Sequence, residues 1–148
     1  MPGIDLSVMV HKLNVRSDFK PVCQKRRSFN AERYQAIEVE VKKRLDAGFI
    51  RPLEYNQWLS NVVLDRKKDN RWRMCLDFTD LNKACPKDCF PLPRIDQLVD
   101  STAGHQLLSF MDAYSGYNQV KMSEADEDKT AFITDKGMYC YKVMPFSL

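Results

Sequence analysis

Apolar residues recur every three or four positions between residues 31 and 46, which is the spacing of one face of an amphipathic helix. Asn30 before this stretch is a good N-cap, and Gly48 after it suits the position that follows a helix. We therefore predict a helix near 31–46 whose charged side chains face solvent. The apolar stripe consists of Tyr34, Ile37, Val41 and Leu45, and the charged face includes Glu38, Lys42, Lys43 and Arg44.

Alternation of apolar and polar residues predicts a β-hairpin farther along the chain. Its strands are 61–64 and 71–78, and the polar residues 67–70 form the turn. Arg73, on the more polar face of the second strand and beside a basic turn, is a candidate anion site. The alternative is an Arg73–Asp77 surface ion pair, which would stabilise the fold little. Period two places Trp72, Met74 and Leu76 on one face and Arg73, Cys75 and Asp77 on the other.

The next part of the chain is predicted to contain one helix. Residues 79–92 hold prolines and several polar residues, so we expect them to be mostly irregular. Pro93 can begin a helix, and Gly104 lies beyond its expected end. The residues expected to form the buried stripe of this helix are Ile95, Leu98 and Val99.

Three further strands are predicted in the C-terminal part. Residues 107–111 form a short apolar run. Residues 130–134 and 138–143 are rich in β-branched and aromatic residues, and 135–137 joins them as a hairpin loop. The acidic stretch 123–128 is expected to be an exposed turn or the start of a helix.

Residues 1–28 show no clear period and are expected to form an extended connector. The mixed order of strands and helices predicts an α+β fold rather than a doubly wound sheet, and 148 residues fit one domain. No apolar run approaches the roughly 20 residues needed to span a bilayer. The N-terminal residues also lack the pattern of a signal peptide, so no membrane partner is expected.

The five cysteines are an odd number without repeated spacing, which indicates free thiols in a reducing compartment. Cys85 and Cys89 could suggest half of a zinc site. The two histidines, His11 and His105, do not lie at zinc-ligand spacing. We therefore do not expect a zinc site.

The net charge is +3, and the basic residues are clustered. One cluster is 25–27 and the other is 66–68, followed by Arg71 and Arg73. Each cluster either contacts phosphates or forms a solvated face. Asp112 follows the apolar run 107–111, and a strand that delivers a carboxylate at its end can present a metal ligand.

A series of short motifs follows one order along almost the whole chain. These are 33–34, 47–50, 58–63, 67–69, 72–78, 80–83, 90–96, 111–117, 129–132 and 143–146. Together they resemble the N-terminal part of a reverse transcriptase. The resemblance is to the gypsy class of long-terminal-repeat retrotransposons, particularly those of plants.

This resemblance implies a reverse transcriptase fold, with the fingers and an incomplete palm of a right-hand polymerase. Residues 1–28 then correspond to a polyprotein connector and residues 29–87 to the first part of the fingers. Residues 88–120 correspond to the start of the palm. Residues 121–148 correspond to the second part of the fingers, which we expect to be truncated.

The reaction that the resemblance implies is nucleotidyl transfer from a deoxynucleoside triphosphate to a primer 3′-hydroxyl on an RNA or DNA template. Two Mg²⁺ ions can activate the attacking oxygen and stabilise the leaving one. Asp112 matches the catalytic metal ligand, and the carbonyl of Ala113 could add an oxygen.

The resemblance also assigns the triphosphate contacts. Arg73 and Lys67 match them, with Lys68 as the alternative to Lys67. Backbone N–H groups of Ser115 and Gly116 would face the phosphates. Tyr117 would lie under the sugar and favour deoxyribose, the alternative being a core aromatic. Cys75 could touch the templating base.

The chain departs from the family pattern at Asp65, Asn70 and Ser147, and it contains no aromatic-x-Asp-Asp motif. We therefore expect an inactive fragment of an RNA-directed DNA polymerase. The alternatives are a non-catalytic nucleic-acid- or nucleotide-binding remnant and a non-functional piece of a degenerate element. Expected partners are template–primer, deoxynucleoside triphosphate and the remainder of the Pol polyprotein, in a cytoplasmic virus-like particle or the nucleus.

Overall fold

The computed structural model describes residues 3–68, 70–86, 91, 93–109, 112–146 and 148. None of the helices within these ranges is long and apolar enough to span a bilayer. The strands are β1 Val10–His11, β2 Ile50–Leu53, β3 Ser60–Arg66, β4 Trp72–Leu76, β5 Lys121–Met122, β6 Phe132–Ile133 and β7 Met138–Tyr141. The helices are α1 Ala31–Asp46, α2 Thr79–Ala84, α3 Ile95–Thr102, α4 Gly116–Gln119, α5 Glu124–Glu127 and the 3₁₀ turn η1 Asp128–Thr130.

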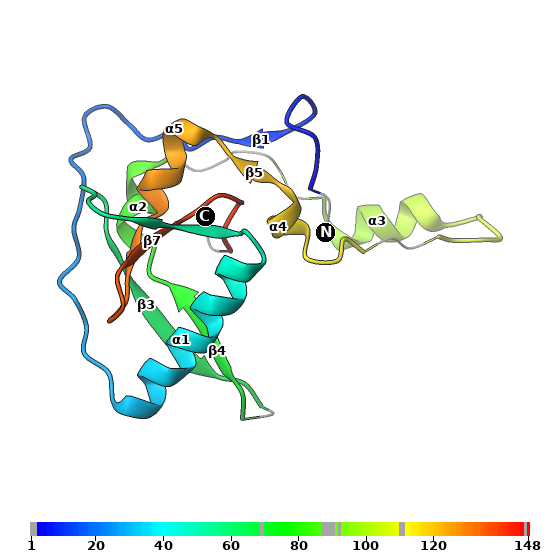
Figure 1. The fold of residues 1–148 in the computed structure, drawn as a ribbon. Coiled ribbons are helices and arrows are strands. Elements are labelled where there is room, and N and C mark those ends of the chain that lie inside the picture. The colour runs from blue at the N-terminus through cyan, green and yellow to red at the C-terminus, as the bar shows by residue number, and fades with distance from the viewer. Residues whose placement is uncertain (1–2, 69, 87–90, 92, 110–111, 147) are drawn as a thin grey trace.

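A mixed sheet organises the described part of the chain (Figure 1). Its strand order is β2-β7-β6-β3-β4. β3 and β6 run parallel, whereas β2–β7, β6–β7 and β3–β4 pair antiparallel. β1 and β5 form a separate parallel pair. This mixture confirms the α+β prediction.

The two predicted hairpins form because their turns have suitable residues. The turn between β3 and β4 closes through a hydrogen bond from Lys67 N–H to the Arg71 carbonyl. Asn70 takes φ 65°, a left-handed conformation that asparagine tolerates better than most side chains. In the β6–β7 hairpin Gly137 takes φ 145°, and Thr134 N–H donates to its carbonyl. Both predicted hairpins are therefore confirmed.

α1 begins and ends as its sequence predicts. The side chain of Asn30 accepts a hydrogen bond from Arg33 N–H, which satisfies one of the unpaired donors of the first turn. Gly48 takes φ 70° after the helix. Ile37 and Val41 are buried against the sheet.

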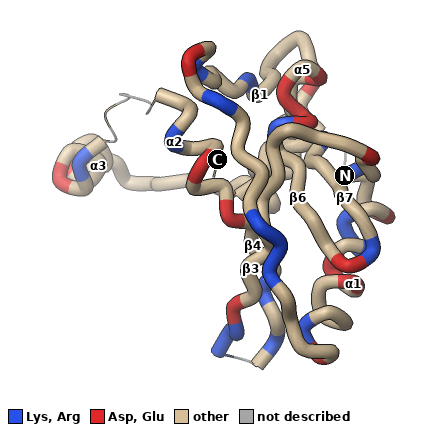
Figure 2. Tube along the Cα trace, turned by 90° about the vertical axis from the view of Figure 1, so that its left-hand side faces the viewer, with Lys and Arg blue, Asp and Glu red and all other residues tan. Residues whose placement is uncertain are grey.

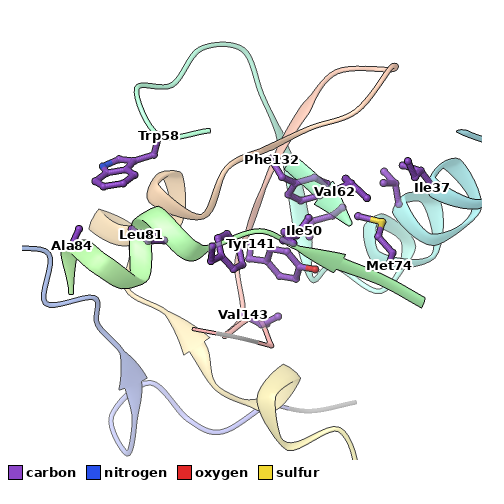
Figure 3. Packing of buried hydrophobic residues seen from close by; sticks show 13 residues of the cluster. Ile37, Ile50, Trp58, Val62, Met74, Leu81, Ala84, Phe132, Tyr141 and Val143 are labelled. Carbon is purple, nitrogen blue, oxygen red and sulfur yellow. The ribbon is translucent and has the colours of Figure 1, made fainter. Parts of the chain in front are cut away.

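The hydrophobic core lies between α1, the sheet and α2 (Figure 3). Phe132 is fully buried, and its ring centroid lies 5.8 Å from that of Tyr139 and 5.9 Å from that of Tyr141. Full burial of an aromatic ring of this size contributes roughly 1.5–3 kcal/mol to folding. Other core members are Ile37, Ile50, Trp58, Val62, Met74, Leu76, Phe78, Leu81 and Val143.

The described residues before α1 follow a largely extended path but pack on this core. Phe19 stacks on Trp58 with ring centroids 6.2 Å apart. Cys23 forms an isolated parallel bridge with Leu59. Leu13 N–H donates to the Asp126 carboxylate at 2.9 Å. This segment is therefore part of the packed structure rather than only a spacer.

Four sequence predictions are wrong or only partly right in this structure. Thr79–Ala84 is the helix α2, although 79–92 was expected to be mostly irregular. The hexapeptide is too short to show a helical period, and it folds because Leu81 and Ala84 are buried. The acidic stretch contains the helix α5, which agrees with one of its two predicted alternatives, but Asp126 and Glu127 are buried rather than exposed. Their burial is possible because Leu13, Lys129 and Arg51 supply hydrogen bonds to their carboxylates.

The other two corrections concern residues 93–109, which we call the arm. The arm projects away from the sheet (Figures 1 and 2). Its helix α3 forms where predicted, but its apolar stripe is exposed instead of buried. Residues 107–109 are not a strand, since no described strand pairs with them and supplies their backbone hydrogen bonds. Phe110 and Met111, like Cys89 and Ser147, lie outside the described residues. The exposed stripe is Ile95, Leu98 and Val99.

Candidate functional site

Two neighbouring cavities lie where α1, β4, β7 and the segment 114–118 meet. The smaller has a volume of about 300 Å³ and is lined mainly by β4 and residues 145–146. The larger, of about 580 Å³, is lined by α1 and residues 114–118. The side chains that border both are Arg44, Tyr141 and Phe146. Residues far apart in sequence thus form one continuous concave region.

Arg73 borders the smaller cavity from β4, where it lies opposite Asp65 of β3. Among the described residues Arg73 makes no ion pair, so its guanidinium is available to an anionic ligand. The Arg73–Asp77 ion pair does not form. Asp77 instead accepts a hydrogen bond from the Thr79 hydroxyl at 2.7 Å and pairs with Arg27 at 2.8 Å.

These hydrogen bonds also fix the charge of Asp77. The hydrogen bond from Thr79, helped by Arg27, holds the pKa of the Asp77 carboxyl below its ordinary value. Arg27 belongs to the basic cluster 25–27, and its backbone N–H donates to the Asn61 side chain. This arginine is therefore a structural link between the N-terminal segment and the end of the β3–β4 hairpin. Figure 2 shows basic residues along the chain that overlies these two strands.

Lys67 and Lys68 lie in the turn of the hairpin. Both line a shallow hollow of about 460 Å³, together with Asp65, Arg66 and Arg73. Either lysine therefore shares a surface with Arg73, and the choice between them stays open. The carboxylate of Asp65 borders the same hollow and lowers its positive charge.

Ser115, Gly116 and Tyr117 form a sharp turn into the short helix α4. Ser115 takes φ 51°, a left-handed conformation. A Cβ on Gly116 would lie only 3.2 Å from that of Ala113, so this position suits glycine. Ser115 and Tyr117 line the larger cavity. The turn therefore brings two of the three predicted contacts, Ser115 and Tyr117, to the cavity wall, whereas Gly116 is not one of the lining residues.

The ring of Tyr117 is 48% exposed and is not a core aromatic. It meets Phe146 edge-to-face, with ring centroids 5.6 Å apart. Pairs in this geometry stabilise each other by about 0.5–1.5 kcal/mol beyond the area that they bury. Phe146, which borders both cavities, thus contacts the ring of Tyr117 in the wall of the larger one.

Asp112 and Ala113 are exposed and line neither cavity. They directly precede Tyr114 and Ser115, which do line the larger one. Across the described ranges no group of three or more His, Cys, Asp or Glu side chains could hold a metal ion. The described part of the chain therefore offers one predicted carboxylate ligand and no assembled metal centre.

Cys75 lines the smaller cavity beside Arg73 and is half-buried. Cys23, Cys75, Cys85 and Cys140 are all free thiols. Burial raises the pKa of the Cys140 thiol to about 11, with a smaller opposing effect of Arg51. The cysteines of the described residues therefore include a cavity-lining thiol and an inert buried one.

Sequence reasoning missed Arg44. Its side chain, expected to be solvated, is only 20% exposed and borders both cavities. The signal was present, because Arg44 lies seven residues after Ile37 and three after Val41, on the buried face of α1. Phe146 was also missed as a site residue, although it closes the last of the recognised motifs.

The family model described as "Reverse transcriptase (RNA-dependent DNA polymerase)" matches residues 66–147. The Pol polyprotein of transposon 412 from Drosophila melanogaster is 31% identical over 137 residues, which cover 88% of this chain and 11% of that protein. The RNA-directed DNA polymerase homolog of Oenothera berteroana is 41% identical over 76 residues, 51% of this chain and 54% of that one. The chain thus spans about a tenth of the length of the Pol polyproteins that it matches.

Solved structures agree with the fold. The native prototype foamy virus protease–reverse transcriptase superposes with a TM-score of 0.76 at 21% identity, covering 94% of this chain and 19% of that one. A foamy viral protease–reverse transcriptase in complex with double-stranded DNA superposes with a TM-score of 0.69 at 16% identity, covering 94% of this chain and 23% of that one. The predicted partial reverse transcriptase fold is thereby confirmed. The chain belongs to the reverse transcriptase family, whose members generally use divalent metal ions.

Proposed function

We propose that this chain forms part of the nucleotide-binding site of an RNA-directed DNA polymerase. The observation that carries the proposal is that the two cavities meet between Arg73 and the Tyr117–Phe146 pair. The cation suits the phosphates, and the exposed aromatic ring suits a deoxyribose. The tight glycine turn lets the backbone approach the ligand closely. Phosphoryl transfer depends mostly on positioning and charge stabilisation, which such a site supplies.

Individual roles follow from these positions. Arg73 would bind the triphosphate through its planar fork, with Lys67 or Lys68 as a point charge at the tip of the hairpin. Backbone N–H groups of Ser115 and Gly116 would lie along the phosphates. Tyr117 would exclude a ribose 2′-hydroxyl.

The metal requirement is only partly met by this chain. Two-ion phosphoryl transfer needs carboxylates that bridge ions about 3.5–4 Å apart. Asp112, with the Ala113 carbonyl, is compatible with one Mg²⁺ ligand position, but no further acidic cluster is assembled within the described residues. The residues present therefore do not fit a complete two-magnesium centre, and we assign no catalytic step to this chain alone.

We further propose that the chain derives from a gypsy-class, plant-type element, on the strength of its ordered motifs. The Oenothera berteroana relative, an RNA-directed DNA polymerase homolog of a plant, supports the plant part of this proposal. Template–primer, deoxynucleoside triphosphate and the rest of a Pol polyprotein would be its partners. Its odd number of cysteines supports a reducing compartment, in a cytoplasmic virus-like particle or the nucleus.

Binding of thymidine triphosphate with Mg²⁺ to the 148-residue chain, measured by titration calorimetry, tests the proposal. Arg73→Gln should weaken binding by about ten- to a hundredfold, because it removes a charge-assisted contact. Arg16→Gln is the matched control, since Arg16 pairs with Asp18 on an exposed surface. Equal affinities for the wild type and Arg73→Gln would contradict the proposal.

A second candidate function is nucleotide or nucleic-acid binding without catalysis, which is favoured by cavities that form without an acidic cluster. Primer extension separates the two. We expect no template-dependent incorporation by the isolated chain, and incorporation would show that Asp112 suffices. Binding to a primer–template duplex should weaken steeply with salt, whereas a flat response would favour a non-functional fragment.

A further inference from the structure

Arg44 occupies the wall between the two cavities, and its contacts are unusual for a helix residue in a basic run. Its Nη2 donates to the Met74 carbonyl at 2.9 Å. Its guanidinium lies 6.0 Å from the centroid of the Tyr141 ring and 3.8 Å from the Glu40 carboxylate. The side chain therefore joins α1 to β4 and β7 at one point.

The Met74 carbonyl has no strand partner. Lys67 N–H donates to the Arg71 carbonyl, and Asp77 N–H donates to the Asn61 carbonyl. In an antiparallel pair every second residue hydrogen-bonds to the neighbouring strand. Between these two bonds, the backbone groups of Arg73 and Cys75 therefore face β3. The carbonyl of Met74 then points to the free edge, since β4 is the outer strand of the sheet. Arg44 is the group that satisfies it.

We propose that Arg44 is a positioning residue of the nucleotide site, acting through the β4 backbone on Arg73 and Cys75. The Met74 carbonyl lies between these two residues, both of which line the smaller cavity. Fixing this carbonyl to α1 would hold this part of β4 in place and so set the position of Arg73 at the wall of the smaller cavity. The inference rests on the proposed function, because it concerns the geometry of the same site.

Only part of the guanidinium is used. Nη1 of Arg44 is buried and has no hydrogen-bond partner among the described residues. The anchoring role therefore requires one donor and a positive charge rather than a planar fork. A lysine can supply both, whereas methionine, which has a similar length and apolar stem, can supply neither.

The test compares wild type, Arg44→Lys and Arg44→Met in two measurements on the 148-residue chain. In ligand-free protein, amide hydrogen exchange at Arg73 and Cys75 should be about tenfold faster in Arg44→Met and unchanged in Arg44→Lys. Amides of β2 and β6 should keep wild-type rates. Uniformly faster exchange throughout the sheet in Arg44→Met would overturn the proposal, because Arg44 would then be a general packing residue.

The second measurement is the affinity for thymidine triphosphate with Mg²⁺. Arg44→Met should bind about tenfold more weakly, because it releases the β4 backbone that places Arg73 and removes a cation from the wall of both cavities, and Arg44→Lys should recover most of the affinity. Arg51→Met is the control. Arg51 pairs with Glu127 and Asp128, lines neither cavity, and should lose stability without losing affinity.

The outcomes separate this inference from the proposed function. If wild type does not bind the triphosphate, the proposed function fails and the inference fails with it. If wild type binds and Arg44→Met binds equally well, the inference fails and the proposed function stands. If Arg51→Met weakens binding as much as Arg44→Met, affinity follows stability and the inference is again overturned.

Discussion

The core and the arm both contain an amphipathic helix, yet they use it differently. In α1 the apolar stripe is buried, with Ile37 only 1% exposed. In α3 Ile95 is 78% exposed, and none of the residues of this helix is buried. The periodic pattern therefore predicts the helix in both cases but not its partner. Burial depends on a second apolar surface, which the described residues supply to α1 and not to α3.

The largest expected difference between the two regions is in the energetics of truncating an apolar side chain. Phe132→Ala in the core should lower the free energy of unfolding by about 3–5 kcal/mol, because it leaves a cavity among Tyr139 and Tyr141. Leu98→Ala in the arm should change it by less than about 0.5 kcal/mol. Urea denaturation measures both. A cost for Leu98→Ala near that of Phe132→Ala would show that the arm is packed in solution.

A smaller difference is expected for hydroxyl groups. The Thr130 hydroxyl is fully buried, accepts from Tyr141 N–H at 2.8 Å and donates to the Glu127 carbonyl at 2.6 Å. Thr130→Val should cost about 1–3 kcal/mol, since both partners lose a buried hydrogen bond. Thr102→Val is the control, because Thr102 donates to Val99 on the exposed arm helix. Similar thermal midpoints for the two variants would contradict the comparison.

The smallest expected effect concerns pH and His11, which lies in β1. Burial lowers the pKa of His11, opposed by the nearby Asp126 carboxylate. The unfolded chain then binds a proton at a pH where the folded chain does not, so stability falls as the pH drops below about 6.5. His11→Gln should reduce the loss of thermal stability between pH 7.5 and 5.5. An unchanged loss in His11→Gln would exclude His11 as the cause.

The sequence was sufficient to predict local structure wherever a helix or hairpin carries its own signals. Asn30, Gly48, Asn70 and Gly137 fix turns and helix ends through short-range geometry. The sequence did not predict α2, because six residues carry too little periodicity. It did not predict the burial of Asp126 and Glu127 either. That burial depends on hydrogen bonds from residues such as Leu13 and Arg51, which are distant in the sequence.

The candidate site was only partly predictable. Arg73, Ser115 and Tyr117 were assigned by resemblance, and the structure shows which surfaces they share. Arg44 has a helical position that places it on the buried face, but its bond to an edge-strand carbonyl depends on the tertiary arrangement. The surroundings of Asp112 could not be predicted from local pattern, because residues 107–109 do not form the strand that was expected to present it.

The most direct test of the account is to map the residues at which a nucleotide binds. Photolabelling of the chain with an azido-deoxyuridine triphosphate and Mg²⁺, followed by peptide mapping, would locate it. We predict labelling of peptides that contain Arg73, Tyr117 or Phe146, suppressed by excess thymidine triphosphate and reduced in Arg73→Gln. Labelling confined to the arm, or labelling that excess triphosphate does not suppress, would contradict a nucleotide site at these cavities.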